Sequence, residues 1–136
     1  MQLLAQSHPR AALCQPPLAL ARTVTACNVE RMIIYEVTTD VPSAAVAAYE
    51  SYMRDTHIPA VLSSGCFVSA SIARSLPGRY RVRYSARNMD VLDRYLATFA
   101  PQFRADFAAH LGSSVKVSRE VWSELQHWTA DPRAAP

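Results

Sequence analysis

The sequence is poor in glycine, lysine and cysteine, and it has no long apolar run. Only 3 of its 136 residues are glycine, and they are not clustered, which excludes a glycine-rich loop that cradles phosphate groups. The 3 cysteines and 4 histidines are scattered without paired ligand spacing, so we expect neither a disulfide framework nor a bound metal. No apolar run reaches the roughly 18 residues of a membrane-spanning helix. We therefore expect a protein without a metal or other cofactor and without a membrane partner.

An excess of charge of one sign is also missing. The net charge is +3, and residues 1–31 hold three arginines against one glutamate. The remaining residues therefore carry 11 basic against 10 acidic groups. A domain so close to neutrality has no electrostatic affinity for nucleic acid, which we exclude as a partner. With 50% apolar and 18% charged residues, the composition is typical of one folded domain, and we expect a cytoplasmic location.

The first 31 residues lack any periodic pattern, because Pro9, Pro16 and Pro17 interrupt each apolar stretch. We interpret residues 1–31 as a disordered tail or as an upstream extension that is not native. A segment ending at Cys27 resembles a lipoprotein cleavage site, but the apolar segment before it is short and is followed by Arg22. The pattern places the folded domain at residues 32–126 and a flexible C-terminal tail at residues 127–136.

Within the domain, four segments have the alternation or β-branched composition of strands. These are residues 32–38, 66–73, 79–86 and 115–122. A first helix is predicted from Asp40 to His57, where Pro59 should end it. A second begins after Asn88, is kinked at Pro101 and stops at Gly112. The order β-α-β-β-α-β predicts an α+β ferredoxin-like plait, a four-stranded antiparallel sheet with two helices on one face.

Alternation also divides the side chains between the two faces of this sheet. The apolar side must face the helices, and it includes Tyr35, Tyr80 and Tyr84. The open face then carries a largely polar set: Glu36, Arg79, Arg81, Arg83, Lys116, Glu120 and Trp122. Strands one and three are central in the usual plait, so Glu36 should lie beside Arg81 or Arg83.

Two interpretations of the open face remain. It is either a solvated surface with weak ion pairs, or it packs on a second copy and closes a barrel around a polar cavity. The second interpretation predicts a homodimer in which Trp122 is covered. The open face has more arginine than carboxylate side chains, and guanidinium groups suit a small polar or anionic ligand. We place this ligand between the two sheets, where it would contact these residues: Glu36, Arg81, Arg83, Glu120 and Trp122.

Other chemistry finds less support in the sequence. An RNA-recognition sheet has the same strand order, but it would need Tyr35 on the open face and would bury Glu36. His57 and His110 are expected at helix ends, where each interacts with the helix dipole. Cys66 is expected to be a small buried residue of the second strand. No proton-transfer residue is therefore predicted on the open face.

From Met32 onward the chain resembles a small bacterial family, domain-of-unknown-function family 4286. The resemblance rests on Met32–Thr38, Gly65–Ala70, Tyr80–Tyr84, Leu92–Leu96 and Ala100–Asp106. It implies a ferredoxin-like plait of the dimeric α/β barrel type, and it implies no activity. Related barrels include cofactor-independent monooxygenases, so a small-molecule enzyme of that type is the alternative to a ligand-binding protein.

Overall fold

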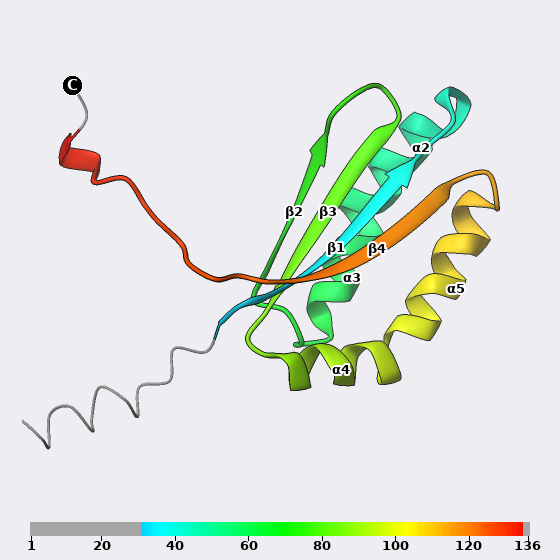
Figure 1. Cartoon of the computed structure of the whole chain (residues 1–136). Coiled ribbons are helices and arrows are strands. Elements are labelled where there is room, and N and C mark those ends of the chain that lie inside the picture. The colour runs from blue at the N-terminus through cyan, green and yellow to red at the C-terminus, as the bar shows by residue number, and fades with distance from the viewer. Residues whose placement is uncertain (1–30, 135–136) are drawn as a thin grey trace, which may run out of the picture.

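A computed structural model describes residues 31–134 of the chain. It contains one sheet with its helices on one side (Figure 1). The strands are β1 (Ile33–Asp40), β2 (Ser69–Arg74), β3 (Arg79–Ala86) and β4 (Lys116–Ser123). They lie in the order β2-β3-β1-β4, and every pairing is antiparallel. The predicted α+β ferredoxin-like architecture is thereby confirmed. The predicted N-terminal tail lies almost wholly outside the described residues.

The first helical segment is longer than predicted. A short turn, η2 (Ser43–Ala45), leads into α2 (Val46–Tyr52), η3 (Met53–His57) and α3 (Ile58–Ser63). The predicted end of the helix at His57 is wrong. The η3 segment is a π-helix, in which the Ile58 amide donates to the Met53 carbonyl. Pro59 directly follows this π turn as the second residue of α3, and the chain stays helical through it.

The second helical segment is two helices rather than one kinked helix. The Asn88 side chain caps α4 (Met89–Thr98) by accepting a hydrogen bond from the Val91 amide at 2.9 Å. The helical backbone is distorted at Phe99, where φ is −109°, and α5 (Ala100–Leu111) begins before Pro101. Figure 1 shows the two helices running in different directions. The break turns α5 away from α4 and over the β4 side of the sheet.

The second strand begins at Ser69, three residues later than predicted. Cys66 is buried as expected, but it lies in the preceding loop together with Phe67. The Phe67 ring packs against Tyr95 of α4 with ring centroids 4.7 Å apart. This inward turn of the loop buries two side chains in the core, so strand pairing starts only after them.

The core lies between the sheet and the helices and is rich in aromatic rings. Tyr49, Val82 and Leu92 are fully buried there. Burial of an aliphatic side chain of this kind contributes about 1.5–3 kcal/mol. Tyr49 also packs on Tyr80, with ring centroids 4.7 Å apart, and its hydroxyl accepts a hydrogen bond from Thr39 at 2.8 Å. No helix among the described residues is long and apolar enough to cross a membrane.

Candidate functional site

The open face of the sheet brings together most of the residues predicted from the sequence. The Glu36 carboxylate lies 3.3 Å from Arg83 Nε and 3.8 Å from Arg81 Nε. The arginine side chains are about half exposed, whereas that of Glu36 is only 14% exposed. Ion pairs of such exposure contribute at most about 1 kcal/mol each. The pairing of Glu36 with its neighbours on β3 is as predicted.

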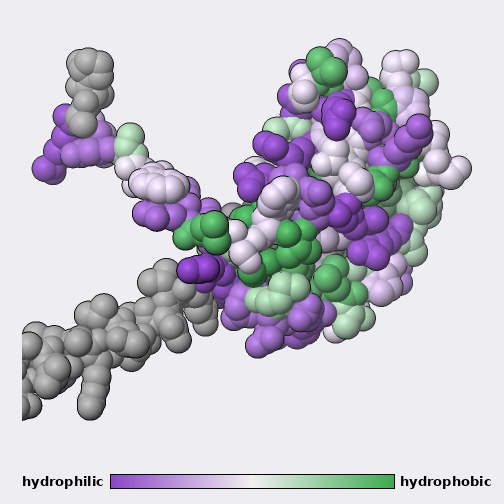
Figure 2. All heavy atoms as spheres, in the orientation of Figure 1, coloured by the Kyte–Doolittle hydropathy of each residue, from purple (hydrophilic) through white to green (hydrophobic). Residues whose placement is uncertain are grey.

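The other two predicted residues lie on β4 at different distances from this cluster. Glu120 is directly opposite Glu36, and Trp122 is opposite Ile34 near the end of the strand. A hollow of about 640 Å³ includes Glu36, Arg81 and Glu120 but does not extend to Trp122. Figure 2 shows this side of the molecule as mainly hydrophilic, with an apolar cluster where the C-terminal segment leaves the domain. The ligand-binding role of these five residues remains a prediction.

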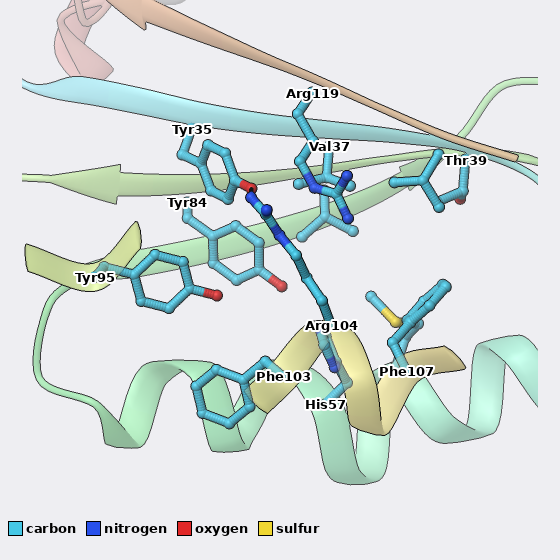
Figure 3. Close-up of a pocket in the computed structure, with 13 residues that line it drawn as sticks. Tyr35, Val37, Thr39, His57, Tyr84, Tyr95, Phe103, Arg104, Phe107 and Arg119 are labelled. Carbon is cyan, nitrogen blue, oxygen red and sulfur yellow. Dashed lines mark hydrogen bonds between the residues drawn. The ribbon is translucent and has the colours of Figure 1, made fainter. Parts of the chain in front are cut away.

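A second candidate site lies on the opposite side of the sheet, beneath the helices (Figure 3). Its cavity of about 40 Å³ is large enough for a carboxylate group or one or two water molecules. Strands supply Tyr35, Tyr84 and Arg119, and the helical layer supplies His57 and Arg104. The rest of the wall consists of these residues: Val37, Thr39, Met53, Val82, Tyr95, Phe103, Phe107 and Val117. We call this cavity the central pocket.

The central pocket holds two cations and no acidic side chain. Arg104 of α5 and Arg119 of β4 both reach into it (Figure 3), and none of the lining residues is Asp or Glu. Arg104 Nη2 donates to the Tyr35 hydroxyl at 3.2 Å. Within residues 31–134 neither guanidinium lies within 4 Å of a carboxylate. Both arginines are exposed at the edge of the pocket, and their positive charge makes it electrostatically suited to an anion.

His57 contributes an unpaired nitrogen beside this pocket. Its Nδ1 is buried and has no hydrogen-bond partner in the described part of the chain. Burial lowers the pKa of the His57 imidazole, and the opposing effect of Asp106 is weaker. The imidazole is therefore neutral at pH 7, because its ordinary pKa is already near 6.5. An unsatisfied buried nitrogen is costly, so a ligand that bonds to it is favoured.

The π-helix of η3 positions this histidine. A π turn is wider than an α turn, and π turns are frequent at functional sites. Met53 and His57 are the first and last residues of η3, and both line the pocket. The His57 ring packs between aromatic neighbours, with centroids 5.6 Å from Tyr52 and Phe107. The imidazole is consequently held in place by packing and not by hydrogen bonds.

Two tyrosine hydroxyls point into the central pocket (Figure 3). Tyr84 and Tyr95 are almost fully buried, and burial raises the pKa of both phenols above the usual range. Arg104 and Arg119 oppose this effect on the pKa of Tyr95. Both hydroxyls remain protonated at neutral pH and serve as hydrogen-bond donors. The pocket thus offers donors from tyrosine and arginine, with one neutral nitrogen at its side.

Sequence reasoning missed this site. Arg119 shares its face of β4 with Val117, so strict alternation places it toward the helices, and an arginine among valines was the available signal. His57 was expected at a helix end, but it lies within a continuous helical segment and faces the core. His110 does lie in the last turn of α5, as expected, and its ring stacks on Tyr52 at 4.3 Å. No sequence pattern indicated Arg104 of α5, because the residue it bonds to, Tyr35 of β1, is distant in the sequence.

No metal site accompanies the pocket in the described residues. Within residues 31–134, no three His, Cys, Asp or Glu side chains gather closely enough to hold an ion. The donors of the central pocket are guanidinium and phenol groups, which bind anions rather than cations.

Solved structures with the same fold are distant in sequence. SnoaB, a cofactor-independent oxygenase from Streptomyces nogalater, is 19% identical, with a TM-score of 0.59 over 71% of this chain and 95% of its own. A dimeric ferredoxin-like protein from an uncultured marine organism is 11% identical, with a TM-score of 0.59 over 73% of this chain and 100% of its own. A Nitrosomonas europaea protein of unknown function is 13% identical, with a TM-score of 0.57 over 76% and 99%. Identities this low establish the fold alone.

The sequence comparisons agree with the fold. No curated protein sequence matches the chain. A family model does match, and it covers residues 32–129, which include all four strands and the whole central pocket. The chain therefore belongs to the family described as "Domain of unknown function (DUF4286)".

Proposed function

We propose that the protein binds a small organic acid through a carboxylate held in the central pocket. The observation that carries this proposal is the pair Arg104 and Arg119, two cations in one cavity whose wall contains no acidic residue. Guanidinium groups match the geometry of a carboxylate with two parallel hydrogen bonds. The small volume selects a single planar oxyanion, because the cavity is far below the roughly 300 Å³ of an ordinary ligand pocket.

The surrounding side chains supply selectivity. Arg104 and Arg119 are exposed at one side of the pocket, whereas Tyr84 and Tyr95 are buried. The carboxylate therefore enters between α5 and β4, and the remainder of the acid stays at this opening. Phe103 and Phe107 of α5 are partly buried there, and they favour a planar, apolar group next to the carboxylate. An aromatic monocarboxylate such as benzoate meets both requirements.

Thermal unfolding of the full chain tests this proposal with sodium benzoate as the probe. At about ten times its Kd, benzoate should stabilise the protein by roughly 1.4 kcal/mol and raise Tm by about 5–10 °C. The Arg119→Gln variant should lose most of this shift. Arg87→Gln is the matched control, because Arg87 is exposed and lies outside the pocket. Sodium chloride at equal ionic strength corrects for screening.

The ligand-free variants separate binding from a structural role. Because Arg119 is exposed, the Tm of ligand-free Arg119→Gln should stay close to that of the natural chain. Neutral benzamide should give no shift in any variant. An equal shift with benzamide, or an undiminished benzoate shift in Arg119→Gln, would contradict the proposal.

Oxygenation without a cofactor is a second candidate, favoured by the neutral, unpaired His57 nitrogen beside an aromatic pocket. In this reaction His57 takes a proton from an acidic methylene group, and the arginines stabilise the resulting anion. Dioxygen is the oxidant. One oxygen atom forms the product carbonyl, and the other leaves as water with the two methylene hydrogens. The similarity of fold to SnoaB is compatible with such chemistry but does not establish it.

Dioxygen uptake with anthrone as the probe tests this second candidate. His57→Gln should abolish an uptake that exceeds the protein-free rate. The pocket must widen to admit anthrone, so α5 would have to move outward. Dioxygen uptake no faster than in protein-free buffer would contradict the oxygenase candidate and leave carboxylate binding as the proposed function.

We also propose that two copies pair through their open faces to form a homodimer. Trp122 is 49% exposed on this face, although it is a large apolar side chain. A second sheet would cover Trp122 and close the 640 Å³ hollow that contains Glu36, Arg81 and Glu120. The enclosed space, with Arg83 at its side, is the site predicted from the sequence for a small polar or anionic ligand. Light scattering over a dilution series should show a dimer at micromolar concentration, and a monomer throughout would contradict the pairing.

A further inference from the structure

The C-terminal segment, residues 124–131, leaves the domain as an extended arm. Figure 1 shows it passing in front of the sheet and continuing beyond the β2 edge. Its first residue is fixed by a hydrogen bond from the Glu124 amide to the Met32 carbonyl at 2.9 Å. Glu124 also shares a small hollow of the open face with Ser69 and Arg83. The arm therefore emerges on the open-face side of the sheet, where the second copy of the proposed dimer lies.

The arm carries the two most exposed large apolar side chains of the described residues. Leu125 and Trp128 are each 76% exposed. Large apolar side chains gain free energy when they are buried, and tryptophan is enriched among the energetic anchors of interfaces. The two side chains are thus suited to an apolar surface outside their own segment.

An apolar groove of suitable size lies between α3 and β2. Its volume is about 520 Å³, and its apolar wall includes Ile58, Leu62 and Ile72. Leu62 is 36% exposed and Ile72 40% exposed, so the described chain covers each of them only in part. β2 is also an edge strand, because it pairs only with β3. A sheet edge with unpaired backbone groups, beside an apolar groove, is a site at which an extended segment can bind as an additional strand.

We infer that the arm of one protomer docks in the α3–β2 groove of a second copy of this chain. The groove opens on the helix side of β2, opposite the face on which the arm of the same protomer emerges. Stacked sheets lie about 10 Å apart, and eight extended residues reach about 26 Å, which is enough to pass around the β2 edge of a partner. Charge agrees in sign, since the arm bears Glu124 and Asp131, whereas the groove is lined by Arg54 and by Arg74, the latter paired with Glu50 at 2.9 Å.

This inference rests on the proposed homodimer, and dilution experiments distinguish the two. Light scattering of the full chain compares the natural sequence with the double variant Leu125→Ser and Trp128→Ser. The double variant should raise the dimer Kd at least tenfold. Met89→Ser is the matched control, because Met89 is 42% exposed on α4 and lines neither the groove nor the open-face hollow. Far-UV circular dichroism establishes that each variant is folded.

A mixing experiment identifies whose groove the arm occupies. Ile72→Glu damages the groove and leaves the arm intact, so it should also weaken the dimer. In an equal mixture of the two damaged chains, a mixed dimer regains one intact arm and groove, and its Kd should fall between those of the natural and damaged dimers. No improvement on mixing would mean that the arm binds its own domain, and the inference would be wrong. A dimer Kd of the arm variant equal to that of the natural chain would overturn the inference but leave the homodimer. A natural chain that is monomeric at all concentrations would overturn both.

Discussion

At the scale of single residues, the central pocket owes its chemistry to side chains that lack ordinary partners. Arg104 bonds to a neutral tyrosine instead of a carboxylate, and the buried nitrogen of His57 bonds to nothing in the described chain. Buried polar groups are nearly always satisfied in folded proteins, and exceptions gather at functional sites. The unpaired state of His57 Nδ1 is therefore better explained by a ligand than by stability.

The titration of His57 gives a prediction at this scale. Burial lowers the pKa of the His57 imidazole in the folded chain below 6.5. Between this lowered pKa and 6.5, the unfolded chain therefore binds a proton at His57 that the folded chain does not bind. The free energy of unfolding should therefore fall as the pH is lowered through 6.5 toward the folded pKa of His57. Urea unfolding at about pH 7.5 and about pH 5.5 should show this loss in the natural chain, and His57→Gln should reduce it.

His127→Gln is the control for the histidine experiment, because the His127 side chain is 68% exposed on the arm. It should show the same loss of stability as the natural chain. An unchanged pH dependence in His57→Gln would mean that the imidazole is not protected by burial.

At the scale of elements, local backbone geometry decides where the chain turns. Gly78, in the turn between β2 and β3, has φ +86°. A Cβ at this position would lie 2.5 Å from the Val41 carbonyl oxygen, which belongs to the segment after β1. The Val41 amide in turn donates to the Gly78 carbonyl at 2.7 Å. This close approach of two backbones ties the β2–β3 turn to the end of β1.

Gly78→Ala should therefore destabilise the fold by about 2 kcal/mol or more, because it adds a backbone collision to the strain of a positive φ. Gly65→Ala is the control. Gly65 has φ +76°, but no atom lies within 4 Å of its added Cβ, so only the strain of about 1 kcal/mol applies. Denaturant unfolding of both variants should reproduce this order, and equal losses would contradict the collision.

The elements show which features the sequence can predict. Alternation places β3 at its observed bounds and assigns Glu36, Arg81 and Arg83 to one face. The end of the first helix was mispredicted because a proline stops an α-helix in isolation but is accommodated after a π turn. The late start of β2 depends on Phe67 packing against Tyr95, a contact between segments far apart in the sequence. Local patterns do not contain such information.

At the scale of the whole molecule, the two faces of the sheet differ in what they carry. The helix face encloses the central pocket, and the open face carries Trp122, the proposed dimer contact. Trp122→Ser should raise the dimer Kd at least tenfold, because buried tryptophans often dominate interface energies. Carboxylate binding should be unaffected. Met89→Ser, a change at a 42% exposed position of α4, is the matched control for loss of exposed apolar surface.

The same scale explains why the open face could be predicted and the central pocket could not. The open face arises from three neighbouring strands, each with a period of two. The pocket joins His57, Arg104 and Arg119 from a π turn, a helix and an edge strand, and only the packing of the helical layer brings them together. The cytoplasmic location and the absence of a nucleic-acid partner remain predictions from composition.

Carboxylate binding in the central pocket is the main proposal, and nuclear magnetic resonance tests it most directly. Sodium benzoate is titrated into the full chain labelled with ¹⁵N, and the shifts of assigned amide signals are mapped onto the structure. The account predicts that the shifts concentrate around His57, Arg104 and Arg119. Shifts confined to the open face near Glu36 and Arg81, or no shifts up to high millimolar benzoate, would contradict it.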